Sequence, residues 1–336
     1  MTRVSALQAS YLPSWLEEPA PAGVSKHAVP LGWRSHNQKG QGILTSTVPA
    51  TDQSAMKTRS FGPFGFLCPV SRIGQGTWRL DDDARQGAIE ALRAGLDAGM
   101  THVDTAEMYG EAEPLVAEAL GDRRKEIFLV SKVLPSNASK ARTIRACEQS
   151  LKRLKTDMLD CYLLHWRGSV PLAETIEAFE RLVDDGKIRS WGVSNFDVDD
   201  LEEALRIAGP GRIACNQVLY HLEERAIEHA VIPWCEANKV AVVGYSPFGS
   251  GDFPSPNSPG GKVLAEVAGE VGASPRAIAL AFLSREPSVF PIPKASSAAH
   301  ARDNATAGDI RLTDSQTARI DAAFTRGPKP RRLPMI

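Results

Sequence analysis

Residues 128–166 read FLVSKVLPSNASKARTIRACEQSLKRLKTDMLDCYLLHW and contain one complete strand–helix–strand unit. Phe128–Val133 opens on an apolar, β-branched run of the kind found in buried strands. The apolar residues that follow recur at spacings of three and four, which predicts one face of a helix: Ile144, Cys147, Leu151 and Leu154. Met158–Trp166 is then a second apolar run of strand length. The stretch therefore predicts two strands joined by a helical crossover.

The same alternation extends outward in both directions along the chain. After a short hairpin at Thr58–Phe66, the other strands are expected at Ser71–Trp78, His102–Ala106, Ile188–Asn195, Ile213–Tyr220, Val240–Pro247 and Val289–Lys294. Between and after these runs the helical spacing returns, and a final helix is expected at Thr313–Phe324, followed by a tail. Eight strand–helix units in about 250 residues predict parallel strands in an α/β fold, the (β/α)8 TIM barrel.

The competing architecture is a doubly wound sheet that binds a dinucleotide through a glycine-rich turn after its first strand. Gly74 and Gly76 begin such a turn, but Arg79 stands at the position of the third glycine. The sequence therefore favours the barrel over the doubly wound sheet.

The 336 residues carry a formal net charge of −1, and no apolar run reaches the roughly 18 residues that a membrane span needs. This balance argues against a nucleic-acid partner, which would call for clustered Lys and Arg. The five cysteines are scattered and form no Cys-x-x-Cys pair, and His221 and His229 form no metal-binding motif, so neither a disulfide framework nor a metal site is expected. We expect a cytoplasmic, monomeric protein whose partner is a small molecule.

Residues 1–55 differ from the patterned region. Prolines recur through them, no helical or strand period is sustained, and they lack the charged start, apolar stretch and cleavage site of a signal peptide. Two interpretations stay open, a disordered extension and a non-native leader that precedes a functional start at Met56. Either way, we expect residues 56–336 to form one barrel.

The strands end in polar or aromatic residues, which matters because barrel active sites lie at the carboxyl ends of the strands. The last one or two residues of successive strands are Thr77 and Trp78, Asp104, Lys132, His165 and Trp166, Ser194 and Asn195, Gln217, Tyr245 and Ser246, and Lys294. Tyr109 follows Asp104 by five residues, in a loop over the same end. A purely structural barrel does not need this set, so it predicts a site at the barrel mouth.

Four of these residues suggest a proton-donating device. Asp104 and Lys132 would form an ion pair, and the Lys132 ammonium would lower the pKa of the Tyr109 phenol from its ordinary value of about 10. A tyrosine with a lowered pKa can donate a proton at neutral pH, and a neutral His165 could hold a carbonyl oxygen beside it. The set therefore predicts protonation of a developing alkoxide.

Several motifs resemble those of the aldo-keto reductase superfamily, in the family's order and on the expected strand ends. They are Asp104-Thr-Ala-Glu-Met-Tyr109-Gly, Val130-Ser-Lys132, Leu163-Leu-His165-Trp, Gly192-Val-Ser-Asn195-Phe, Asn216-Gln217-Val, Tyr245-Ser-Pro and Ile292-Pro-Lys294. The match begins near residue 57 and continues to the C-terminal region. Within the family the chain looks most like bacterial reductases of methylglyoxal and of diketo acids.

The resemblance implies a catalytic set and a cofactor. Tyr109 would be the general acid, supported by Lys132, Asp104 and His165, and NADPH would supply the hydride. The positions that match cofactor-binding residues of the family are Ser194, Asn195, Gln217, Tyr245, Ser246, Lys294 and Asn304, and the substrate pocket would include Trp78 and Trp166. The pattern departs at His300, where the family often has arginine, so NADH stays an alternative.

The expected activity is NADPH-dependent reduction of small aldehydes and α-dicarbonyls to alcohols. Two alternatives stay open, a reductase of sugar aldehydes or diketo acids and a cofactor-sensing regulatory protein. Residues 249–261 and 326–336 would set the choice of substrate, but their sequences do not reveal it.

Overall fold

A computed structural model describes residues 58–64, 70–80 and 85–336 of the chain. Residues 1–55 lie outside the described residues, so the division of the chain at residue 55 stays a prediction.

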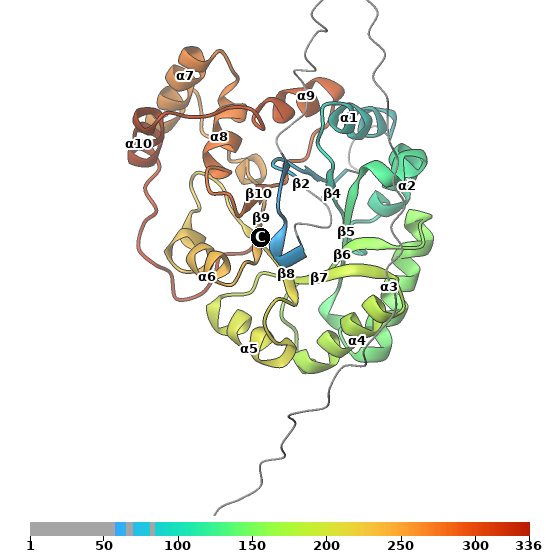
Figure 1. Cartoon of the computed structure of the whole chain (residues 1–336). Coiled ribbons are helices and arrows are strands. Elements are labelled where there is room, and N and C mark those ends of the chain that lie inside the picture. The colour runs from blue at the N-terminus through green and yellow to red at the C-terminus, as the bar shows by residue number, and fades with distance from the viewer. Residues whose placement is uncertain (1–57, 65–69, 81–84) are drawn as a thin grey trace, which may run out of the picture. The chain divides into compact units, whose positions relative to one another are not determined.

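Eight parallel strands form one sheet, which confirms the expected (β/α)8 architecture (Figure 1). Its neighbours follow the chain order: β3 (Gln75–Gly76), β4 (His102–Asp104), β5 (Phe128–Val133), β6 (Leu159–Leu164), β7 (Ile188–Ser194), β8 (Ile213–Leu219), β9 (Ala241–Tyr245) and β10 (Val289–Pro291). The first and last strands also meet, because the Gly74 amide donates to the Pro291 carbonyl at 2.9 Å and the Gly76 amide to the Pro293 carbonyl at 3.0 Å. These two bonds link the edges of the sheet into a barrel.

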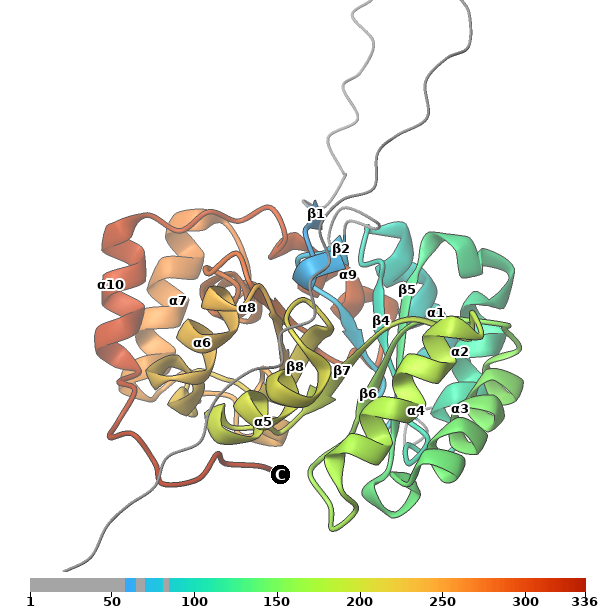
Figure 2. The same cartoon turned by 60° about the horizontal axis from the view of Figure 1, so that its bottom comes forward.

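Helices surround the sheet in the views of Figures 1 and 2. They are α1 (Arg85–Asp97), α2 (Ala112–Leu120), α3 (Lys140–Leu154), α4 (Leu172–Asp184), α5 (Val198–Ala208), α6 (Val231–Ala237), α7 (Pro259–Val271), α8 (Pro275–Leu283), α9 (Ala298–Thr306) and the additional α10 (Asp314–Ala323). In α3, the residues predicted to share a face pack against the barrel, since Cys147, Leu151 and Leu154 are buried. Asp197 caps α5, accepting from the Asp200 amide as its position before the helix suggests.

The barrel interior is filled from one end. A cluster of buried residues from the strands includes Phe128 and Phe290, and Phe61 packs against both with ring centroids 4.8 and 5.2 Å away. Phe61 belongs to the N-terminal hairpin, in which β1 (Thr58–Arg59) pairs with β2 (Val70–Ser71). Figure 2 shows this hairpin at one end of the barrel and the C-terminus at the other. The hairpin therefore covers the N-terminal end of the barrel, and the carboxyl ends of the strands remain as its open mouth.

The N-terminal hairpin is present as expected, but its bounds and those of the first barrel strand were predicted wrongly. The sequence suggested a hairpin within Thr58–Phe66 and a strand at Ser71–Trp78, but Ser71 pairs with Thr58 in the hairpin and the barrel strand is only Gln75–Gly76. The cause is a bend after β2, where the Ser71 hydroxyl donates to the Ile73 carbonyl at 2.8 Å. The sequence of residues 71–78 does not reveal that its first residue pairs in the hairpin sheet while Gln75 and Gly76 pair in the barrel sheet.

Candidate active site

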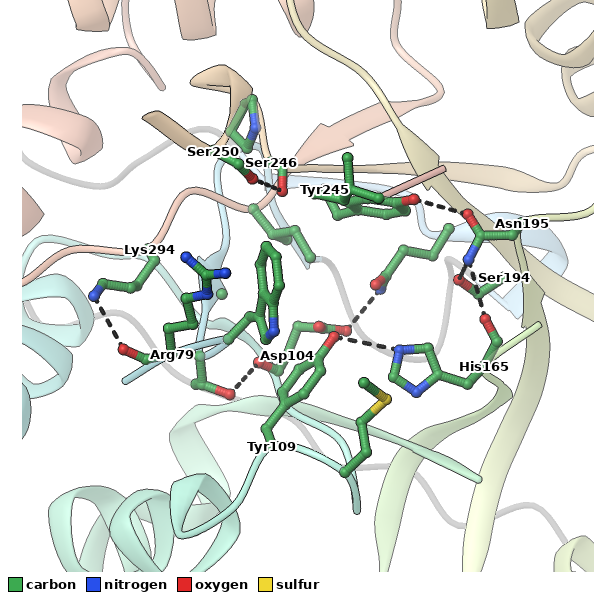
Figure 3. Close-up of a pocket in the computed structure, with 18 of the residues that line it drawn as sticks. Arg79, Asp104, Tyr109, His165, Ser194, Asn195, Tyr245, Ser246, Ser250 and Lys294 are labelled. Carbon is green, nitrogen blue, oxygen red and sulfur yellow. Dashed lines mark hydrogen bonds between the residues drawn. The ribbon is translucent and has the colours of Figure 1, made fainter. Parts of the chain in front are cut away.

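A cavity of about 380 Å³ opens at the carboxyl ends of the strands (Figure 3). The residues predicted from the sequence that line it are Trp78, Asp104, Tyr109, His165, Trp166, Ser194, Asn195, Gln217, Tyr245, Ser246 and Lys294. Lys132 lies beneath its wall, in contact with two of the lining residues. Asn304 is buried on α9 and is not among the lining residues. The strand ends thus meet at one mouth, as the barrel requires.

Lys132 is the centre of the polar network below the cavity. Its side chain is fully buried, and its Nζ donates to Asp104 Oδ1 at 2.6 Å, to the Thr105 carbonyl at 2.8 Å and to the Tyr109 hydroxyl at 3.3 Å. The other Asp104 oxygen accepts from Gln217 Nε2 at 2.7 Å. Each charge is therefore paired and hydrogen-bonded, which buried ions need in order to remain charged.

The Tyr109 pKa differs from the sequence expectation. Burial raises it, and this effect outweighs the opposite effect of the Lys132 ammonium, so the phenol has a pKa above its ordinary value rather than below it. For Lys132 itself, burial lowers the pKa, but Asp104 and Tyr109 together outweigh burial and the pKa is raised. In this structure the pair therefore consists of a neutral phenol and a charged ammonium.

His165 faces the Tyr109 hydroxyl from the next wall of the cavity. Its Nε2 lies 3.5 Å from that oxygen, and the two rings meet edge to face with centroids 5.6 Å apart. Burial, with Lys132 nearby, lowers the His165 pKa to about 3, so the imidazole is neutral at physiological pH, as the sequence analysis assumed. A neutral ring can donate from Nε2 to an oxygen placed beside Tyr109.

A second group lines the opposite wall, where Tyr245 donates from its hydroxyl to Asn195 Oδ1 at 2.9 Å (Figure 3). Asn195 in turn donates to Ser194 Oγ at 3.2 Å and to the His165 carbonyl at 3.1 Å. Asn195, Ser246 and Ser250 have left-handed backbones, with φ of 61°, 50° and 55°. Such conformations cost free energy in residues other than glycine and gather at functional sites.

Among the lining residues that the sequence analysis did not single out are Arg79, Met108 and Phe248, whereas Ile336 lies in the expected stretch 326–336. Arg79 stacks its guanidinium 4.7 Å from the Trp78 ring centroid, and its carbonyl accepts from Lys294 Nζ at 3.1 Å. Arg79 directly follows Trp78, the expected strand end, and this position was the available sequence signal. Phe248 and Ile336 come from a loop and from the C-terminal stretch, whose paths the sequence pattern does not determine.

The chain belongs to the aldo/keto reductase family, which matches residues 72–324, and is thus an oxidoreductase. It is 44% identical over 268 residues to methylglyoxal reductase YeaE of Escherichia coli, covering 79% of this chain and 94% of that protein. Glyoxal reductase of Bacillus subtilis is 31% identical over 78% of this chain and 92% of its own length. A crystal structure of an aldo-keto reductase from Klebsiella pneumoniae in complex with NADPH superimposes with a TM-score of 0.77 at 43% identity, covering 84% of this chain and all of that one.

Within the described ranges, none of the helices is both long enough and apolar enough to span a membrane. Over the same residues, His, Cys, Asp and Glu side chains form no group of three that could hold a metal ion. The described cysteines are buried free thiols: Cys147, Cys161, Cys215 and Cys235.

Proposed function

We propose that the protein reduces small aldehydes and α-dicarbonyls such as methylglyoxal to alcohols, with NADPH as the cofactor. The observation that carries this proposal is the chain of contacts from Asp104 through Lys132 to the Tyr109 hydroxyl, with His165 beside it at the cavity. Relatives named methylglyoxal reductase and glyoxal reductase support the substrate class. The NADPH complex of the Klebsiella pneumoniae protein supports the cofactor.

The cavity residues suit a nicotinamide. Tyr245 is anchored through its hydroxyl to Asn195, which leaves an aromatic ring in the cavity wall on which the nicotinamide would stack. Ser194, Asn195 and Gln217 carry the donors and acceptors that a carboxamide needs. Lys294 would bind the 2′-phosphate, and Asn304 would face the adenine. When bound, NADPH would supply the hydride that reaches the carbonyl carbon.

The protein's own residues would handle the oxygen. His165, neutral and protonated at Nε2, would hold the carbonyl oxygen next to the Tyr109 hydroxyl. As negative charge develops on that oxygen, Tyr109 would transfer its phenolic proton to it. The Lys132 ammonium, 3.3 Å from the phenol oxygen, would stabilise the phenolate that is left, and Asp104 would keep Lys132 in place. The alcohol then carries one hydride and one proton more than the carbonyl compound.

Apolar side chains form part of the cavity wall at the proposed substrate end. Trp78, Trp166 and Met108 line the cavity with apolar surface, which would exclude water from the reacting atoms. The alternatives remain a reductase of sugar aldehydes or diketo acids and a cofactor-sensing regulatory protein.

An aldehyde panel with both cofactors tests the proposal. We expect NADPH oxidation, followed at 340 nm, to depend on methylglyoxal and to be faster than with sugar aldehydes or diketo acids at equal concentration. Faster turnover of a sugar aldehyde or a diketo acid would move the substrate class to that compound. Binding of NADPH without turnover of any panel member would indicate the regulatory alternative.

The shifts in pKa predict an unusually flat pH profile for the reduction. Tyr109 is active when protonated, and because its pKa is raised, the active form persists through neutral pH and is lost only above the ordinary value of about 10. His165, with a pKa of about 3, stays neutral throughout this range. We expect the single-turnover rate at saturating cofactor to be constant from about pH 5 to pH 9. A titration centred near pH 6.5 would contradict the assignment of a neutral His165.

A further inference from the structure

A second hollow of about 340 Å³ lies next to the active-site cavity, and the two share Gly251 in their linings. Its walls come from the segment 251–256, from α7 and from the first turn of α8, with Asp303 of α9 on one side. In Figure 1 these three helices lie together on one side of the barrel. The apolar part of the wall includes Phe253 and Leu264, which suits a flat aromatic group. The hollow is thus a continuation of the site in which the nicotinamide half is proposed to bind.

Arg276, the second residue of α8, lies at the junction of the two cavities. Its guanidinium carbon is 4.8 Å from the ring centroid of Phe253 and 5.6 Å from that of Phe248, and the two rings meet edge to face. Phe248 lines the first cavity, whereas Phe253 and Arg276 line the second. The stacking restricts a side chain that would otherwise sample many rotamers, which leaves the guanidinium preorganised for a ligand.

Among the described residues, no carboxylate forms an ion pair with Arg276, although Asp303 lines the same hollow. Asp303 Oδ2 instead accepts from the Ser274 hydroxyl at 2.7 Å. A planar guanidinium without a carboxylate partner, on the wall of a hollow, fits the geometry of a phosphate.

We propose that Arg276 binds a phosphate group of the adenosine half of NADPH, between Phe248 of the first cavity and Phe253 of the second. This inference rests on the proposed function, because it requires a dinucleotide with its nicotinamide at Tyr245. Two parts of the cofactor carry the required chemistry, the diphosphate bridge and the 2′-phosphate, and titration with both NADPH and NADH separates them.

The test is isothermal titration of the full-length, cofactor-free protein with NADPH and with NADH. We compare the wild type with Arg276→Met, Arg276→Lys and a matched control, Arg206→Met, whose exposed arginine lies on α5 outside both linings. Arg276→Met should weaken NADPH binding about 10-fold, equal to about 1.4 kcal/mol. Arg276→Lys should retain part of the affinity, and the control should bind like the wild type. The effect should shrink at high salt, since it is electrostatic.

The pattern of loss identifies the phosphate. A loss for NADPH alone assigns Arg276 to the 2′-phosphate, and an equal loss for both cofactors assigns it to the diphosphate bridge. Unchanged binding of both cofactors by Arg276→Met would overturn the inference, and so would a loss of the same size at low and high salt, which would indicate packing alone. If the wild type bound neither cofactor, the proposed function itself would fail, and this inference with it.

Discussion

Tyr109→Phe is expected to lower the single-turnover rate of carbonyl reduction by about 10³-fold while leaving the affinity for NADPH unchanged. The substitution removes one oxygen, which lies 3.3 Å from the Lys132 ammonium and 3.5 Å from His165 Nε2. Without it, the developing alkoxide has no proton donor within the network, and His165, with a pKa of about 3, carries no spare proton at neutral pH. Stopped-flow measurement of NADPH oxidation, together with titration of the cofactor, separates the two effects.

Tyr162→Phe provides the matched control for this experiment. Tyr162 is also a buried tyrosine, on β6, but its hydroxyl has no hydrogen-bond partner among the described residues and lies outside the cavity lining. Removing that hydroxyl should leave the rate unchanged. A Tyr109→Phe variant that turned over methylglyoxal at the rate of the wild type would rule out the proposed proton donor. A loss of NADPH affinity equal to the loss of rate would point to a binding role instead.

The barrel could be predicted from the sequence because its central strands carry the signal locally. β5 and β6 are mostly apolar and lie on either side of α3 in the sequence, whose apolar residues recur at helical spacing, so the strand–helix–strand unit can be recognised from the sequence alone. The hairpin was predicted, but its second strand was not, because Val70 and Ser71 pair with Arg59 and Thr58 rather than continuing into the barrel. Strand pairing depends on which segments meet in space, and a run of apolar residues does not contain that information.

At the active site, too, the identity of the residues could be predicted from the sequence, whereas their burial and long-range contacts could not. The rule that barrel strands end at the active site predicted Asp104, Lys132 and His165 together, and the structure places them within one network at the mouth. The direction of the Tyr109 pKa was wrong because the sequence shows a neighbouring charge but not the depth of burial, which dominates here. Arg276 was missed because its contacts with Phe248 and Phe253 join segments that the chain separates by a helix.

Breaking the Asp104–Lys132 pair is expected to lower both the stability of the fold and the rate of turnover. Lys132→Met leaves the buried Asp104 carboxylate with Gln217 as its one remaining partner in the network described above. Removing one partner of a buried ion pair leaves the other as an uncompensated buried charge. The free energy of unfolding should therefore fall by roughly 3 kcal/mol. Denaturant unfolding measures this loss, and the rate of hydride transfer should fall at the same time because the phenolate of Tyr109 loses its ammonium.

Adding Asp104→Asn to Lys132→Met separates the two effects. The double variant carries no buried charge at this point, and the new amide can still accept from Gln217, so most of the lost stability should return. The rate should not return, because neither the methionine at position 132 nor the asparagine at position 104 carries a positive charge that could stabilise the Tyr109 phenolate. If the rate recovered along with the stability, the pair would act only as a scaffold, and the proton-transfer role of Lys132 would be wrong. Recovery of stability without recovery of rate therefore assigns to Lys132 a chemical role that its burial alone does not prove.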